Sequence, residues 1–236
     1  MKMKIGALKG LGLSALLALG SLVFAAGTPA PAGGTPSGAA GDAGKYIGAE
    51  KCKNCHEAKS KGSQFSAWKA TKHAHAFDVL ATDEAKKTAK AKGIDDPQKA
   101  DACLKCHVTA FGAPAASLAK GFPVNLGVQC ETCHGPGEKH FKARMAAAGE
   151  EDAGSEWVEV PDDEIVKSPT AKTCLACHNE ESPSFKPFCF KKRSHEIQHL
   201  DPRRKRTAEE LKAMQCGCAE CTCKQGECGD HHGGQK

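Results

Sequence analysis

The stretch Cys130-Glu131-Thr132-Cys133-His134 carries the pattern Cys-x-x-Cys-His, which occurs four times in the chain. The other copies are Cys52/Cys55/His56, Cys103/Cys106/His107 and Cys174/Cys177/His178. From 14 cysteines and 11 histidines in 236 residues, chance predicts roughly 0.04 copies. Two thiols about one helical turn apart can form thioethers to one porphyrin, while the following imidazole binds the iron. A zinc ribbon would not need a histidine after every pair, and a thioredoxin-like pair would occur once, so the spacing predicts four covalent c-type haems (haem c).

The composition is typical of a chain that needs a cofactor to fold. Aromatic residues make up 5% and the mean hydropathy is −0.45, which is lean for an ordinary core of this length. Four porphyrins would supply the missing apolar mass, so we expect the haem-free chain to be poorly folded. The formal net charge is +5, but four haems with ionised propionates would add about −4. The charge therefore indicates no nucleic-acid partner.

The chain divides by composition into four segments. Residues 1–25 combine early lysines, an apolar stretch and a small-residue cleavage pattern, which predicts a signal peptide and a periplasmic or secreted protein. Residues 26–44 are rich in Gly, Ala and Pro and are expected to form a flexible linker. Residues 45–200 hold the four motifs and form the expected tetrahaem cytochrome c domain. Residues 201–236 form a basic and Cys-rich tail.

The predicted fold class is mostly α, with short helices and loops wrapped around four covalently bound haems and little or no β-sheet. No stretch shows a convincing period-2 strand pattern. Helices are expected over residues 64–80 and over residues 83–92, the latter with Thr82 as N-cap and Gly93 as stop. Thr207 and Glu210 form a capping-box pattern for another short helix. We expect the haem motifs at the C-terminal ends of helices, and Phe65 and Trp68, one turn apart, in the core.

The remaining histidines decide between an electron carrier and a catalyst. Four are proximal ligands by the motif, which leaves seven candidates for the opposite faces of the irons: His73, His75, His140, His195, His199, His231 and His232. A haem iron with two imidazole ligands is suited to electron transfer, whereas an open position allows a small molecule to bind.

Several segments resemble one family in order and spacing. The first motif is followed by residues 66–76, which read SAWKATKHAHA; the second motif by Val108 and Phe111-Gly112; the third is flanked as GVQCETCHGPG; and the fourth reads CLACH. Over roughly residues 48–200 the chain is similar to the tetrahaem cytochrome c-554 family of nitrifying bacteria and their relatives. The resemblance implies closely packed haem pairs, with three bis-histidine haems and one five-coordinate haem.

The resemblance also implies which histidines are distal ligands. His73 would bind the fourth haem and His140 the first, and the second haem would have no distal protein ligand. The third haem would take either His195 or His199, and we favour His199 because it closes the matched segment. His75 is interpreted as a solvated or hydrogen-bonded residue, although it is an alternative ligand for the second haem. The predicted iron ligands are His56, His107, His134, His178, His73, His140 and His199.

Six further cysteines lie outside the motifs: Cys189, Cys216, Cys218, Cys221, Cys223 and Cys228. Their spacing, with His231 and His232 nearby, is compatible with a thiophilic metal ion such as Zn²⁺ or Cu⁺, or with disulfides formed in an oxidising compartment. The basic run at residues 203–206 is interpreted as a solvated lead-in to the next helix, with docking to an acidic redox partner as the alternative.

These features favour a periplasmic electron carrier that connects unidentified donor and acceptor proteins, including transient contact with a membrane-bound acceptor. We assign no catalytic residue on this hypothesis. The alternative is a haem enzyme that reduces nitric oxide or a related nitrogen species at an open second haem, held by His107.

Overall fold

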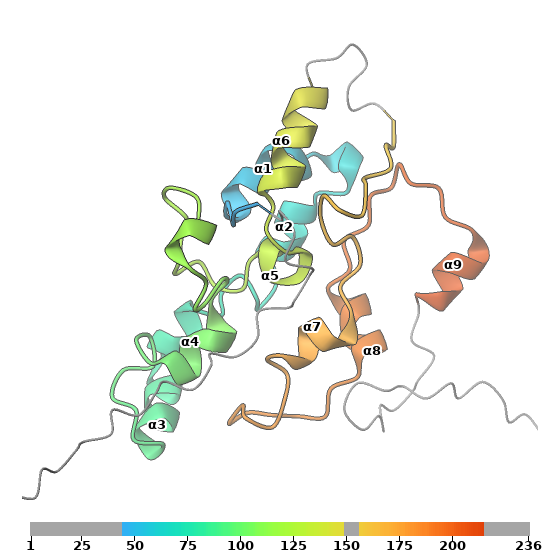
Figure 1. Ribbon diagram of the computed structural model, residues 1–236. Helices are drawn as coiled ribbons and strands as arrows, with labels where there is room; N and C mark the ends of the chain where they lie inside the picture. Colours follow the sequence, from blue (N-terminus) through green and yellow to red (C-terminus); the bar gives the residue numbers. More distant parts are fainter. Residues whose placement is uncertain (1–43, 149–155, 215–236) are drawn as a thin grey trace, which may run out of the picture. The chain divides into compact units, whose positions relative to one another are not determined.

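The computed structural model describes residues 44–148 and 156–214, all within one compact unit of the chain. The predicted signal peptide, nearly all of the linker, five of the six further cysteines, His231 and His232 lie outside the described residues. The described part consists of short helices joined by loops (Figure 1). Its β-structure is limited to an isolated bridge between Tyr46 and Leu118. The predicted mostly α fold class is therefore confirmed.

The helices of the described part are all short, and the longest has ten residues. The elements are α1 (Ala49–His56), η1 (Lys59–Lys61), α2 (Gln64–Lys69), η2 (Asp78–Ala81), α3 (Asp83–Ala91), α4 (Asp101–His107), η3 (Ala115–Ser117), α5 (Cys130–His134), α6 (Glu138–Ala147), α7 (Ala171–Leu175), α8 (Phe190–Glu196) and α9 (Ala208–Ala213). None of the helices in the described ranges is long and apolar enough to span a bilayer.

The two predicted helix starts with side-chain caps are confirmed. The Thr82 hydroxyl accepts a hydrogen bond from the backbone N–H of Ala85, and α3 ends before Gly93, which has a φ of +73°. At α9, the Thr207 hydroxyl accepts from the Glu210 N–H while the Glu210 carboxylate accepts from the Thr207 N–H, forming a complete capping box.

The helix predicted over residues 64–80 is wrong beyond its first two turns. Helix α2 ends at Lys69, and the Thr71 hydroxyl donates to the carbonyl of Trp68. After this point the backbone is hydrogen-bonded to a distant segment: the Val128 N–H donates to the His73 carbonyl at 2.9 Å. Tertiary hydrogen bonding thus overrides the local helical pattern, and only the 3-10 turn η2 follows.

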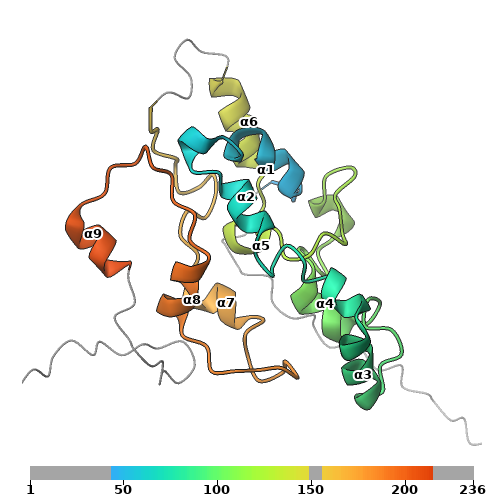
Figure 2. The ribbon, with the colours of Figure 1, turned by 180° about the vertical axis from the view of Figure 1, so that it is seen from behind.

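The small core lies where α1, α2 and α5 meet. These helices lie close together in both ribbon views (Figure 1 and Figure 2). The buried cluster contains Ala49, Phe65, Trp68 and Ala74, with Leu126 and Cys130 packed against it. The predicted core positions of Phe65 and Trp68 are confirmed, since both side chains are buried. The Trp68 indole N–H also donates to the Val128 carbonyl at 2.8 Å, so the core is tied to the segment before the third motif.

Two polar residues of the third motif region fasten α5 to the start of α1. The buried Glu131 carboxylate accepts from the backbone N–H groups of Ile47, Gly48 and Gly137 at 2.7–2.8 Å. The Gln129 amide oxygen accepts from the Ala49 N–H at 2.9 Å. Burial raises the pKa of the Glu131 carboxyl, although its three backbone donors act in the opposite sense. The two side chains flank Cys130, so they fix the first motif relative to the third.

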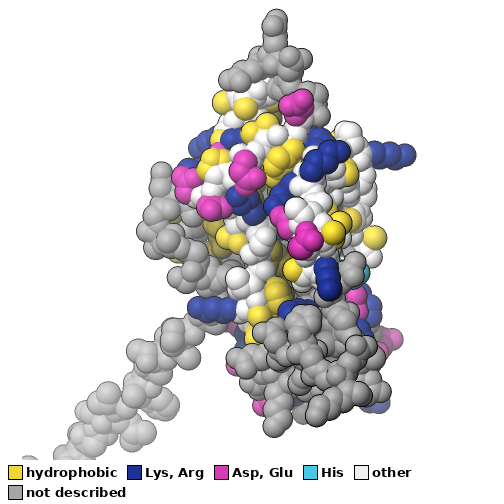
Figure 3. All heavy atoms as spheres, turned by 90° about the vertical axis from the view of Figure 1, so that its right-hand side faces the viewer, with side chains coloured by type: hydrophobic (Ala, Val, Ile, Leu, Met, Phe, Trp, Pro, Cys, Tyr) yellow, Lys and Arg dark blue, Asp and Glu magenta, His cyan; other side chains and the backbone are white. Residues whose placement is uncertain are grey.

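Much apolar surface remains exposed around this core. Exposed large hydrophobic side chains include Val79, Val124, Met145, Val158, Val166 and Leu211. On the face seen in Figure 3, hydrophobic side chains are scattered among charged ones rather than gathered into one patch. The described part of the chain therefore has only a small apolar core, in agreement with its low content of aromatic residues.

Candidate haem sites

The four motifs are placed at helix ends. Helices α1, α4 and α5 each end on the motif histidine, at His56, His107 and His134. The fourth motif differs, because α7 ends at Leu175 and its last two motif residues follow in a turn. In that turn the N–H groups of Cys177 and His178 both donate to the Cys174 carbonyl. The predicted location at helix C-terminal ends is therefore confirmed for three motifs. For the fourth motif it is wrong in part, because α7 ends three residues before His178.

The motif cysteines bring the four attachment points together in pairs. All eight thiols are free and half-buried. The thiols of Cys52 and Cys130 lie close enough together to shift each other's pKa, as do those of Cys106 and Cys177. The first motif is therefore adjacent to the third, and the second to the fourth. The thiol of Cys133 is also close enough to Cys174 for that neighbour to add to its raised pKa.

The pKa values of these thiols follow from their contacts. The interaction between the two thiols raises the pKa of Cys52 and lowers that of Cys130. The interaction with the Cys177 thiol likewise lowers the pKa of Cys106 to about 7. Burial is the main cause of the raised pKa of Cys133, which reaches about 11. All eight thiols are half-buried, and Cys130 packs against the apolar cluster of Ala49, Phe65, Trp68 and Ala74.

Three motif histidines face a second histidine from elsewhere in the chain. The ring centres of His56 and His140 are 6.2 Å apart, those of His134 and His199 are 5.9 Å apart, and those of His73 and His178 are 6.0 Å apart. Metal–imidazole bonds are about 2 Å long, so two ligating nitrogens on opposite sides of one metal lie about 4 Å apart. With ring nitrogens about 1 Å from each ring centre, the centres would be about 6 Å apart. The three pairs therefore fit axial ligation of one iron each.

The paired rings differ in their relative orientation. The planes of His56 and His140 are inclined by 35°, whereas those of the other two pairs are inclined by 69° and 73°. The histidine partners come from α6, from the turn after α2 and from the segment after α8. Segments far apart in the sequence thus meet at each pair.

Several imidazoles are oriented by a hydrogen bond at Nδ1. His107 donates to the Ala76 carbonyl at 2.5 Å, His134 to the Val166 carbonyl at 2.6 Å, and His199 to the Ile197 carbonyl at 2.9 Å. A proton on Nδ1 leaves the lone pair on Nε2, the nitrogen on the far side of the ring. These bonds fix both the tautomer and the direction in which each imidazole can bind a metal.

His140 is oriented by a charged partner instead. Its Nδ1 lies 3.3 Å from the buried carboxylate of Glu164, which also accepts from the Arg144 guanidinium at 2.8 Å. Among the imidazoles paired in the described ranges, this is the one with a carboxylate at Nδ1. Glu164 and Val166 lie before the fourth motif and carry no recognisable signal in the sequence, so sequence reasoning missed both.

Burial lowers the pKa of five of the paired imidazoles, those of His56, His73, His134, His140 and His178. Neighbouring histidines lower the pKa of the first three further. A neutral imidazole has the free lone pair that a metal ligand requires.

His107 stands apart from the other motif histidines. No imidazole faces it among the described residues. The segment that contains His75 contacts its Nδ1 side, through the Ala76 carbonyl. The His75 side chain itself is exposed and lies 3.5 Å from Asp78. His195, the alternative to His199, is also exposed, on α8.

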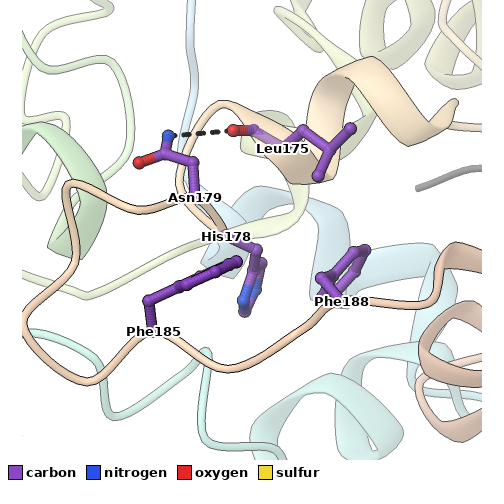
Figure 4. A pocket seen from close by; sticks show the side chains of 5 residues that line it. All are labelled: Leu175, His178, Asn179, Phe185 and Phe188. Carbon is purple, nitrogen blue, oxygen red and sulfur yellow. Dashed lines mark hydrogen bonds between the residues drawn. The ribbon is translucent and has the colours of Figure 1, made fainter. Parts of the chain in front are cut away.

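A cavity of about 240 Å³ adjoins the fourth motif, lined by Leu175, His178, Asn179, Phe185 and Phe188. In Figure 4 the two phenylalanine rings lie on either side of His178. The Phe188 ring stacks on the imidazole, with centres 4.6 Å apart and planes inclined by 20°. The Asn179 amide donates to the Leu175 carbonyl and holds the turn. This apolar hollow beside a motif histidine suits a porphyrin edge.

The tail and the basic run are partly described. Cys189 is buried and disulfide-bonded, which favours the disulfide interpretation for this residue. In the basic run, Arg203 pairs with Asp201, Arg204 with Glu210, and Arg206 donates to backbone carbonyls. The run does lead into α9, but its three arginines are half-buried and bonded within the segment rather than solvated as interpreted.

Gly127 provides a test of the contact between the His73 turn and α5. It has a φ of +82°, and a Cβ atom there would lie 2.8 Å from the carbonyl oxygens of both His73 and Ala74. We expect Gly127→Ala to destabilise the protein by roughly 2 kcal/mol or more and to disturb the His73–His178 pair. Thermal unfolding and the haem spectrum measure the two effects. Gly93→Ala is the matched control, since Gly93 also has a positive φ but a Cβ atom there would meet no atom within 4 Å. Equal losses of stability in the two variants would contradict the packing explanation.

Glu164 provides a test of the charged partner at His140. A carboxylate at Nδ1 makes an imidazole a stronger donor and stabilises a ferric iron bound to it. We expect Glu164→Gln to shift one haem midpoint potential in the positive direction, as measured by potentiometric titration. Glu159→Gln, which removes an exposed partner of Lys167, is the control. Unchanged potentials in a correctly folded Glu164→Gln protein would show that the carboxylate does not act on the ligand.

In the described ranges, short helices that carry Cys-x-x-Cys-His motifs at or near their ends, together with facing imidazole pairs, have the arrangement of a c-type cytochrome. Residues 51–135 match the model of the family described as cytochrome c554 and c-prime. Over 143 residues the chain is 32% identical to cytochrome c-554 of Nitrosomonas europaea, a match that covers 56% of this chain and 57% of that protein. The chain is thus similar to cytochromes of the c554 type over these segments.

The chain thus spans little more than half of the length of that relative. A solved structure of the reduced state of cytochrome c554 from Nitrosomonas europaea is similar with a TM-score of 0.40 and 24% sequence identity. That match covers 73% of this chain and 79% of the solved one.

Proposed function

We propose that this chain is a tetrahaem cytochrome that transfers electrons between redox proteins outside the cytoplasm. The observation that carries the proposal is the set of three facing imidazole pairs at 5.9–6.2 Å. An iron with two imidazole ligands has no site for a substrate and exchanges electrons without making bonds. Bound haem would supply the reversible one-electron chemistry.

The protein residues would hold and orient the four groups. Each motif would supply two thioether sulfurs and one proximal imidazole, and His140, His199 and His73 would complete the first, third and fourth sites. The contacts Cys52–Cys130 and Cys106–Cys177 support close placement of sites one with three and two with four. The closeness of Cys133 and Cys174 connects the two pairs. Electrons could then pass along the chain of sites in the order one, three, four, two.

The second site supports a second candidate function. His107 has no facing imidazole among the described residues, and the His75 segment contacts the side of its ring that points away from Nε2. An open position there would bind nitric oxide or a related small molecule, and the chain would then be an enzyme or a carrier with a reactive site.

The location and domain limits belong to the same proposal. A signal peptide over residues 1–25, a linker over residues 26–44 and a cytochrome domain over residues 45–200 would place the haem sites in the periplasm, where c-type haems are attached in bacteria. The redox partners are proteins whose identity is open.

The carrier function is tested by reductive titration of mature protein from a host that attaches c-type haem. We expect reversible uptake of four electrons, with the same absorbance during reduction and reoxidation. Uptake of fewer electrons by fully loaded protein, or irreversible reduction, would contradict a four-haem carrier. Faster turnover of nitric oxide than free haem achieves would favour the enzyme instead.

A further inference from the structure

Unpaired positive charge is concentrated around the first motif. The segment from Glu50 to Lys72 has six lysines and two glutamates, and the lysines are Lys51, Lys53, Lys59, Lys61, Lys69 and Lys72. None of these six forms an ion pair within the described ranges, and all but the half-buried Lys61 are exposed. We call these six residues the lysine cluster.

Many basic residues elsewhere in the described chain have acidic partners, although α8 (FKKRSHE) holds three basic residues and one glutamate. Lys105 pairs with Glu181, Lys139 with Asp163, and Lys167 with Glu159 and Asp162. In the basic run, Arg203 pairs with Asp201 and Arg204 with Glu210. The region of α3, residues 83–101, has five basic and five acidic residues. The lysine cluster is therefore a local excess of positive charge, with six lysines and two glutamates, and it differs from the excess at α8 in lying at a haem motif.

Two lysines of the cluster are held in place by aromatic rings. The Lys53 ammonium lies 5.4 Å from the centre of the Phe65 ring, and the Lys69 ammonium lies 6.0 Å from that of Trp68. The two rings are themselves 5.3 Å apart. Cation–π contacts of this kind orient a charged head without neutralising it. Lys53 on α1 and Lys69 on α2 are thus connected through two rings in contact. The two helices lie side by side in Figure 2.

The cluster adjoins the first haem site. Lys53 lies between Cys52 and Cys55 of the motif, and α1 ends on His56. Positive charge beside a redox site speeds the approach of a negatively charged partner and favours one orientation of that partner. A partner docked on α1 and α2 would therefore have its redox centre near the first site.

We propose, on the basis of the carrier function proposed above, that the lysine cluster is the docking surface for a redox protein with an acidic face. An anionic membrane is the less suitable occupant, because the aromatic residues beneath the lysines, Phe65 and Trp68, are buried and cannot insert into lipid. The basic run is the less suitable docking surface, since Arg203 pairs with Asp201, Arg204 pairs with Glu210, and Arg206 donates to backbone carbonyls.

The test uses reduced flavodoxin, an acidic one-electron carrier, as the probe and stopped-flow absorbance of the oxidised holoprotein as the readout. We expect the rate to fall as salt rises, and Lys53→Gln/Lys69→Gln to lower it about threefold to tenfold at low ionic strength. The double variant should also show a smaller salt dependence. Lys86→Gln/Lys87→Gln on α3 removes the same charge elsewhere and should leave the rate within a factor of two.

Reduction by photoreduced lumiflavin, a neutral small molecule, separates the docking surface from the carrier function. All three proteins should react with it equally. Equal flavodoxin rates in all three proteins, or an equal loss in both double variants, would overturn the docking surface and leave the carrier intact. Failure of the wild-type holoprotein to accept electrons even from lumiflavin would overturn the carrier function. Loss of binding to anionic phospholipid vesicles in the Lys53/Lys69 variant, with unchanged flavodoxin rates, would identify a membrane surface instead.

Discussion

His199→Ala is expected to convert one low-spin haem of the oxidised protein to high spin. The His199 ring faces His134 at 5.9 Å and is fixed by the Ile197 carbonyl, so its removal leaves the third site with one imidazole. Electron paramagnetic resonance of the ferric protein measures the change. Added imidazole should restore the low-spin signal.

His195→Ala is the matched control for this prediction. His195 is exposed on α8, four residues before His199, and faces no motif histidine in the described ranges. We expect its spin states to match those of the wild type. A spin change in His195→Ala with none in His199→Ala would show that His195, and not His199, is the ligand of the third site.

The reduced protein is expected to bind carbon monoxide at one haem in four. His107 has no facing imidazole among the described residues, whereas the other three motif histidines do. An iron with one protein ligand binds carbon monoxide, and an iron with two imidazoles does so poorly. The stoichiometry follows from absorbance changes during titration with dissolved gas.

His75→Ala is the variant that makes this result decisive. His75 is exposed and belongs to a segment that contacts the Nδ1 side of His107, so its loss should not change the stoichiometry. Absence of binding in the wild type, together with binding in His75→Ala, would show that His75 closes the second site. It would also remove the basis of the enzyme hypothesis.

The local part of the fold could be predicted from the sequence because its signals are local. The Thr82 and Thr207 caps lie within a few residues of the groups that they bind, and the structure shows both. The helix predicted over residues 64–80 failed because the competing hydrogen bond comes from Val128, more than 50 residues away. Periodicity cannot detect such a partner.

The haem motifs could be recognised in the sequence because their chemistry fixes the spacing. The residues that orient the histidines could not be recognised in this way. Glu164 and Val166 act on His140 and His134 from a loop in which no spacing rule applies. The stacking of Phe188 on His178 likewise depends on a turn between them. The role of Gln129 and Glu131 in fixing α1 beside α5 appears only once their backbone partners are known.

The intact mass of the mature protein tests the central claim most directly. Four Cys-x-x-Cys-His motifs whose eight thiols are free and half-buried should each hold one haem through two thioether bonds. The account predicts a mass, after denaturation and reduction, that exceeds that of the processed polypeptide by four haems. An excess of three or fewer in protein from a host with complete cytochrome c maturation would contradict it.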